Sequence, residues 1–101
     1  MEQDNNQIMN AAIQVVPLEK SATAIEMIDR SIEIIQQSGM NYSVSAFETN
    51  VDGTWEDIIS LLTSLRNQLK NEAVEDALIN VKFQISNGKS VVGDDKTRKF
   101  K

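Results

Sequence analysis

The sequence contains neither cysteine nor histidine. Disulfides and thiolate nucleophiles are therefore excluded, as are catalytic sets that need histidine, such as the Ser–His–Asp triad. Zinc sites built from cysteine and histidine are excluded too, so a metal ion would have only oxygen ligands. No run of carboxylates has the spacing of a calcium loop. We therefore expect no metal site and no bound cofactor.

Long apolar runs are also missing. No stretch approaches the roughly 18 residues of a membrane span, and residues 1–7 lack the basic and apolar segments of a secretory signal. The net charge is −5 over 101 residues, which makes nucleic acid a poor partner for the body of the protein. We expect a cytoplasmic protein that binds neither nucleic acid nor a membrane.

A chain of this length fits one domain. We expect a flexible N-terminus over 1–7, a ligand-binding domain over 8–92 and a basic C-terminal tail over 93–101. The basic side chains of this tail are Lys96, Arg98, Lys99 and Lys101. A patch for nucleic acid is one interpretation of them, and a solvated or partner-docked tail is the ordinary one.

Alternating apolar and polar residues predict four strands. The expected strands cover residues 8–16, 41–47, 48–52 and 77–86, with a further short strand possible over 90–92. Pro17 cannot donate to a strand ladder and marks the end of the first strand. Asn87–Gly88 is a strong turn signal.

Two helices are expected, over 24–38 and 55–71. In the first, Thr23 and Glu26 match a capping box, and Gly39 stands where a helix usually ends. The apolar residues expected on its buried side are Ile25, Ile28, Ile32 and Ile35.

The second helix is expected to be capped by Thr54, with Asp57 favouring its positive end. Its apolar spacing also fits a coiled coil, but only about two heptads exist, so a helix packed on a sheet is favoured. Trp55 is expected to anchor the core at its start.

The order β-α-β-β-α-β predicts a ferredoxin-like α+β sandwich, an antiparallel four-stranded sheet with two helices on one face. The other face is then bare. Its expected residues are Asn10, Ala12, Gln14, Val16, Ser43, Ser45, Phe47, Asn80, Lys82 and Gln84. Amides, hydroxyls and one ring suit a subunit contact or a ligand pocket. A plain solvated face is the alternative.

Three segments together resemble a known family. They are NAAIQVVPL, then IDRSIEIIQQSGMNYSVSAFETNVDG, then INVKFQI. In order and spacing they are similar to the small thiamine-binding proteins of the YkoF/MTH1187-like group, also called the UPF0045 or DUF77 family, over about residues 8–86. The most specific parts are QVVPL, SGMxY and the TxxxG spacing from Thr49 to Gly53. The step Phe47–Glu48 departs from a glycine- or serine-containing turn common in that pattern.

The resemblance implies a ferredoxin-like fold, homodimers joined through their sheets and tetramers of these dimers. It also implies non-catalytic binding of thiamine or its hydroxymethylpyrimidine part. The expected ligand-binding residues are Gln14, Tyr42, Ser45, Phe47, Thr49 and Asn50, with Glu48 near the cationic thiazolium ring. Amides and hydroxyls suit the aminopyrimidine edge, and aromatic rings or a carboxylate suit a cation. Tyr42 as a core residue and Phe47 as a subunit contact are the alternatives.

Two other functions stay open. A structural or regulatory homo-oligomer without a small-molecule ligand would use the bare sheet face for assembly alone. An enzyme would use the carboxylates of Glu48, Asp52 and Glu56 for acid–base work. These three fall in a turn and a helix start, where solubility explains them. Because the sequence offers no histidine, cysteine or metal set beside them, we expect no catalysis.

Overall fold

The computed structural model describes residues 7–18, 22–72 and 74–101. The elements in chain order are β1 (Met9–Pro17), α1 (Ala22–Gln37), β2 (Asn41–Val44), β3 (Thr49–Gly53), α2 (Trp55–Leu69), β4 (Ala77–Gln84), α3 (Gly93–Thr97) and a 3-10 turn (Arg98–Phe100). The strands form one antiparallel sheet in the order β2-β3-β1-β4. The predicted ferredoxin-like fold is therefore confirmed. No helix within the described ranges has the length and apolar character needed to span a bilayer.

The strand register leaves part of β1 open on one side. On its β3 side, pairing ends where Ile13 lies opposite Thr49. On its β4 side, pairing continues to Pro17, which lies opposite Ala77. The last residues of β1 therefore have a strand neighbour on only one side, next to the loop that joins β2 to β3.

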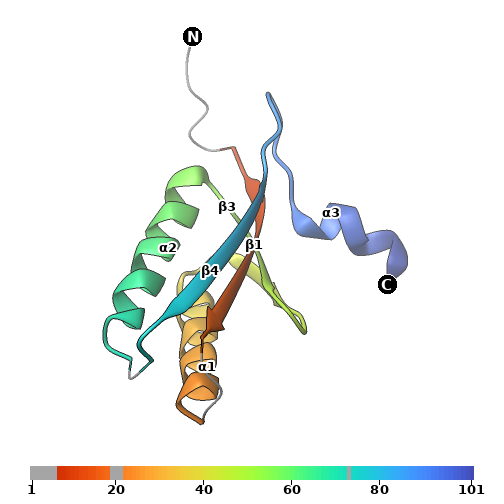
Figure 1. The fold of residues 1–101 in the computed structure, drawn as a ribbon. Coiled ribbons are helices and arrows are strands. Elements are labelled where there is room, and N and C mark those ends of the chain that lie inside the picture. The colour runs from red at the N-terminus through yellow and green to blue at the C-terminus, as the bar shows by residue number, and fades with distance from the viewer. Residues whose placement is uncertain (1–6, 19–21, 73) are drawn as a thin grey trace.

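Helices α1 and α2 cover one face of the sheet (Figure 1). The core between the layers consists of Met9, Ala11, Ile13, Ile35, Val51, Ile58, Leu61 and Leu65. Thr54 caps α2 as predicted: its hydroxyl accepts from the Asp57 N–H at 3.1 Å, and the Asp57 carboxylate accepts from the Thr54 N–H at 3.4 Å. Trp55 is half exposed and contacts the Phe83 ring at 5.3 Å, so the predicted core anchor is wrong.

The buried side of α1 differs from the prediction. Its buried residues are Ala24, Met27, Ser31 and Ile35, whereas Ile25 is 63% exposed and Ile28 is 36% exposed. Ile25, Ile28 and Ile32 do lie on one side of the helix, but the side that packs is rotated from it toward Met27 and Ser31. The small side chains of Ala24 and Ser31 allow the closer approach of neighbouring elements.

The predicted start of α1 is also wrong. The helix begins at Ala22, so Thr23 lies inside its first turn and is not the cap. The position before Ala22 falls outside the described residues.

The second sheet face is not bare, because α3 lies over part of it (Figure 1). The Asp52 carboxylate accepts from the Gly93 N–H at 2.9 Å and from the Asn10 amide at 3.0 Å. Lys96 donates to the Gln84 side chain at 2.7 Å. Residues 90–92 form no strand, although the Val91 N–H donates to the Ile8 carbonyl at 2.8 Å.

The last residues are less basic than the lysine and arginine count indicates. Asp94 pairs with Lys101 at 2.9 Å, and Asp95 pairs with Arg98 at 3.1 Å. The hydrogen bond from Lys101 lowers the pKa of the Asp94 carboxyl. These ion pairs thus neutralise part of the positive charge of residues 93–101.

An ion pair fastens α1 to the end of α2. Arg30 donates to the Glu72 carboxylate through Nε at 2.8 Å and through a second nitrogen, and Gln68 donates to the same carboxylate. The Glu72 side chain is almost fully buried, whereas Arg30 is partly exposed.

This pair predicts a pH dependence of stability. The hydrogen bond from Arg30 holds the pKa of Glu72 below its ordinary value. A carboxyl whose pKa is lower in the folded state stabilises the fold above the unfolded pKa of about 4.3 and loses this effect as the pH falls. We expect Glu72→Gln to lower the melting temperature by several degrees at neutral pH and to flatten its decline in acid. Urea unfolding across a pH series measures this, with exposed Glu75→Gln as control. Equal acid sensitivity in Glu72→Gln and the wild type would contradict it.

Candidate functional site

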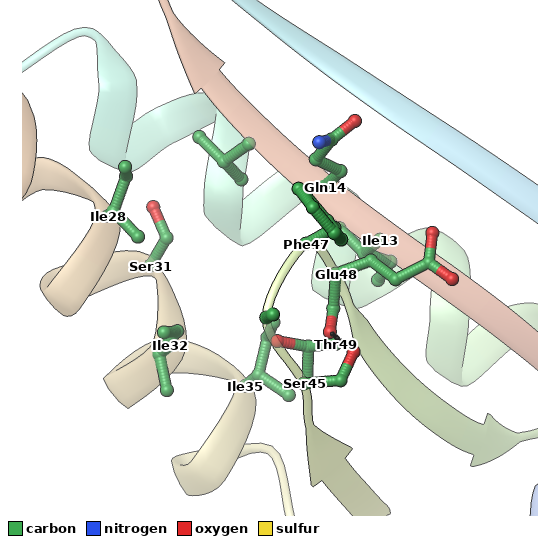
Figure 2. A pocket seen from close by; sticks show the side chains of 12 residues that line it. Ile13, Gln14, Ile28, Ser31, Ile32, Ile35, Ser45, Phe47, Glu48 and Thr49 are labelled. Carbon is green, nitrogen blue, oxygen red and sulfur yellow. Dashed lines mark hydrogen bonds between the residues drawn. The ribbon is translucent and has the colours of Figure 1, made fainter.

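A pocket of about 130 Å³ opens between α1, the end of β1 and the loop from β2 to β3 (Figure 2). We call it the α1 pocket. Its lining residues are Ile13, Gln14, Val15, Ile28, Ser31, Ile32, Ile35, Ser45, Ala46, Phe47, Glu48 and Thr49. The pocket exists because β3 begins at Thr49, opposite Ile13, whereas β1 continues to Pro17. The end of β1 therefore has no neighbouring strand on its β3 side, next to α1.

A tight turn over residues 45–48 forms one wall of the pocket. The Ser45 N–H and the Ser45 hydroxyl both donate to the Glu48 carbonyl, at 3.0 and 2.7 Å. Phe47 lies in this turn and is largely exposed. The predicted placement of Phe47 on the bare sheet face is therefore wrong. Strand β2 ends at Val44 because the chain needs these four residues to reverse.

Two buried hydroxyls lie among the apolar residues of the pocket. Ser31 is 3% exposed and Thr49 is 4% exposed. Thr49 was predicted as a ligand-binding residue, but Ser31 was missed. The available signal is the position of Ser31 four residues from both Met27 and Ile35, on the helix side next to the expected isoleucine stripe.

At the mouth of the pocket, Glu48 and Gln14 each contact a residue of β4. Glu48 lies 3.5 Å from the Lys82 amine, which is highly exposed. The Gln14 carbonyl oxygen accepts from the Asn80 amide at 3.2 Å. The Gln14 amide group therefore retains its donors, and the Glu48 carboxylate, which pairs with Lys82, points away from α1 (Figure 2).

A larger hollow of about 790 Å³ lies beneath α3 on the other face of the sheet, and we call it the α3 hollow. Its lining residues are Asn10, Met40, Asn41, Tyr42, Ser43, Ser45, Asn50, Asp52, Gly93, Asp94, Thr97 and Lys101.

The six predicted ligand residues are thus divided between two hollows. Gln14, Phe47 and Thr49 line only the α1 pocket, Tyr42 and Asn50 line only the α3 hollow, and Ser45 lines both.

The carboxylates considered for acid–base work do not meet. Glu48 is at the mouth of the α1 pocket, and Asp52 binds Gly93 and Asn10 in the α3 hollow. Glu56 is exposed on α2 and lines neither. Over residues 7–18, 22–72 and 74–101, no three histidine, cysteine or acidic side chains gather as metal ligands would.

Comparison with known sequences decides the family. The profile of the thiamine-binding proteins matches residues 11–101. The chain belongs to the thiamine-binding protein family. The resemblance drawn from the three sequence segments is therefore confirmed. A UPF0045 protein of Clostridium perfringens is 24% identical over 92 residues, which cover 91% of this chain and 96% of that protein.

Solved structures of similar proteins share the fold. A DUF77 domain from Bacillus cereus superimposes with a TM-score of 0.87 at 24% identity, covering 99% of this chain and 96% of that one. A protein of Thermotoga maritima whose name proposes a role in thiamine biosynthesis or salvage superimposes with a TM-score of 0.85 at 26% identity. That match covers 93% of this chain and 99% of the other. Both solved structures thus agree with this chain in architecture over nearly its whole length.

Proposed function

We propose that this protein binds thiamine, or the hydroxymethylpyrimidine part of it, in the α1 pocket without catalysing a reaction. Family membership supports the class of ligand. The observation that carries the assignment to this site is the pocket itself, which combines apolar walls with the buried hydroxyls of Ser31 and Thr49. Apolar walls with a few fixed polar groups are typical of small-molecule sites.

The size of the pocket favours one ring of the ligand. A dry cavity of about 150 Å³ holds a single benzene molecule, and the α1 pocket measures about 130 Å³. The aminopyrimidine ring therefore fits inside, and the thiazolium ring and its hydroxyethyl arm would extend past the mouth. There the exposed Phe47 ring and the Glu48 carboxylate suit a flat cation.

The wider role is proposed on the same grounds. The protein acts as a cytoplasmic carrier or buffer and assembles into homodimers or tetramers. Exposed apolar side chains beside the pocket, among them Ile25, Val44 and Phe47, support assembly. A homo-oligomer without any ligand is the second candidate, and it is distinguished by titration.

Calorimetric titration tests the proposal with thiamine, a cation, and hydroxymethylpyrimidine, which is neutral. We expect thiamine to bind with a dissociation constant of about 10 μM or lower, near 7 kcal/mol of binding free energy. Glu48→Gln removes the charge at the mouth and should weaken thiamine by about threefold to tenfold. The neutral pyrimidine should bind this variant as it binds the wild type.

Glu56→Gln is the matched control, because Glu56 is exposed on α2 and lines neither hollow. It should leave both affinities unchanged. If neither compound releases heat or raises the melting temperature at millimolar concentration, the binding function is wrong and the ligand-free oligomer takes its place.

A further inference from the structure

Residues 93–101, which form α3 and the 3-10 turn after it, lie over the sheet without adding to the core (Figure 1). We call this segment the cover. Every residue from Asp94 to Lys101 is exposed, and Phe100 is 77% exposed. Burial of apolar surface is the main force that holds one element against another. The cover therefore gains very little from this force.

Polar contacts attach the cover to the sheet instead. Among the described residues, two hydrogen bonds join it to the strands. The Gly93 N–H donates to the Asp52 carboxylate at 2.9 Å, and this bond is partly buried. The Lys96 amine donates to the Gln84 side chain at 2.7 Å, and this bond is exposed. Because water competes for exposed partners, the bond from Gly93 to Asp52 is the main attachment. We call it the latch.

The other charged contacts of the cover are internal. Lys101 pairs with Asp94 at 2.9 Å, and Arg98 pairs with Asp95 at 3.1 Å. These ion pairs remain intact when the segment separates from the sheet. Opening therefore breaks the latch and the exposed lysine contact, and the cover moves as a unit.

The chain just before the cover is fixed in place. Val91 is 8% exposed, and its N–H donates to the Ile8 carbonyl at 2.8 Å. The Ser90 hydroxyl accepts from the Ile8 N–H at 2.9 Å. A fixed segment next to a weakly held one defines a pivot, which here is Val92, the residue before α3.

The cover bridges a cavity rather than filling it. The α3 hollow of about 790 Å³ lies beneath it, within the size range of small-molecule sites. Four polar residues on paired positions of β2 and β3 line the sheet side of the hollow: Asn41 opposite Asp52, and Ser43 opposite Asn50. A well-packed contact would leave no such space.

The latch depends on a glycine. A Cβ atom on Gly93 would lie 3.0 Å from the amide nitrogen of Asn10. Asn10 has little room to move, because it is 6% exposed and its amide donates to Asp52 and to the Val51 carbonyl. A side chain at position 93 therefore pushes the cover away from the sheet.

We propose that residues 93–101 form a hinged cover that pivots at Val92, is held closed by the bond from Gly93 to Asp52, and controls access to the α3 hollow. In the open form the sheet stays folded, and the amides and hydroxyls of the hollow become accessible to small solutes. The inference does not depend on the proposed function, because the α1 pocket lies on the other face of the sheet.

Amide hydrogen exchange of the intact protein tests the pivot and the latch. Val91 lies on the fixed side of the pivot, and Gly93 lies on the moving side. We expect the Gly93 amide of the wild type to exchange at least about 100-fold faster than the Val91 amide, relative to their intrinsic rates, because the cover opens without the sheet. In Asp52→Ala, Gly93 should exchange within about threefold of an unstructured amide, while Val91 stays protected.

Asp95→Ala is the matched control, because Asp95 pairs with Arg98 inside the cover. It should leave the exchange of Gly93 within about threefold of the wild type. Equal protection of Gly93 and Val91 in the wild type would mean that the cover leaves only when the sheet opens, and it would overturn the inference. Wild-type protection of Gly93 in Asp52→Ala would overturn it as well.

Thiol labelling tests the control of access. The chain has no cysteine, so Asn50→Cys introduces a single thiol into the hollow, and Asn80→Cys introduces one on an exposed position of β4 outside it. Adding Gly93→Ala changes no charge and should speed the reaction of the first thiol with an aromatic disulfide reagent by about tenfold. The second thiol should react at an unchanged rate. Equal rates at position 50 with and without Gly93→Ala would show that the cover does not restrict access, and the inference would be wrong.

Discussion

Ile28→Trp is expected to abolish ligand binding while leaving the fold intact. Ile28 lines the α1 pocket and is 36% exposed, so a larger side chain can turn into the pocket without entering the core. The pocket holds only one ring, and an indole would occupy that space. We expect affinity for hydroxymethylpyrimidine to fall about 100-fold or more, which corresponds to about 2.7 kcal/mol. Calorimetric titration and the melting temperature measure the two effects separately.

Ile25→Trp provides the matched control. Ile25 lies on the same helix, one turn earlier, but it is 63% exposed and does not line the pocket. Its substitution should leave affinity within about twofold of wild type, as surface substitutions usually do. Equal binding by Ile28→Trp and Ile25→Trp would show that the ligand does not enter the α1 pocket.

Ile58→Ala is expected to have the largest effect on stability. Ile58 is fully buried where α2 packs on the sheet. Removing three carbons from such a site costs about 2–5 kcal/mol through lost burial and the cavity that remains. A domain of this size is stable by about 5–15 kcal/mol in total. Urea denaturation should therefore show a midpoint far below that of the wild type.

The adjacent Ile59→Ala controls for this substitution in the same helical turn. Ile59 is exposed, and its loss should cost less than about 1 kcal/mol. A similar loss for both variants would mean that α2 does not present Ile58 to the core.

Periodicity was sufficient to predict the fold because the sheet and α2 have one clearly apolar side each. In β1, Met9, Ala11 and Ile13 recur at every second residue, and all three belong to the core between sheet and helices. In α2, the Thr54 cap and the buried Ile58 follow from local sequence signals that tertiary contacts do not override.

The site was predicted less well, since its shape depends on contacts between distant segments. The orientation of α1 is decided by packing: the buried side is rotated from the isoleucine stripe toward Met27 and Ser31, so the stripe alone does not reveal that Ser31 is buried. The turn at residues 45–48 depends on the Ser45 hydroxyl, which the alternation of residues 41–47 does not reveal. The helix α3 is attached to the sheet through Asp52, far away in sequence. None of these contacts is encoded in a local pattern.

The most direct test of the account is to locate the ligand on the protein. A titration with hydroxymethylpyrimidine, followed by nitrogen–proton correlation spectra, reports which backbone amides change their surroundings. We predict the largest shifts at Ser31, Glu48 and Thr49, around the α1 pocket. Shifts centred instead on Asn41 and Gly93 would place the ligand in the α3 hollow and contradict the central claim.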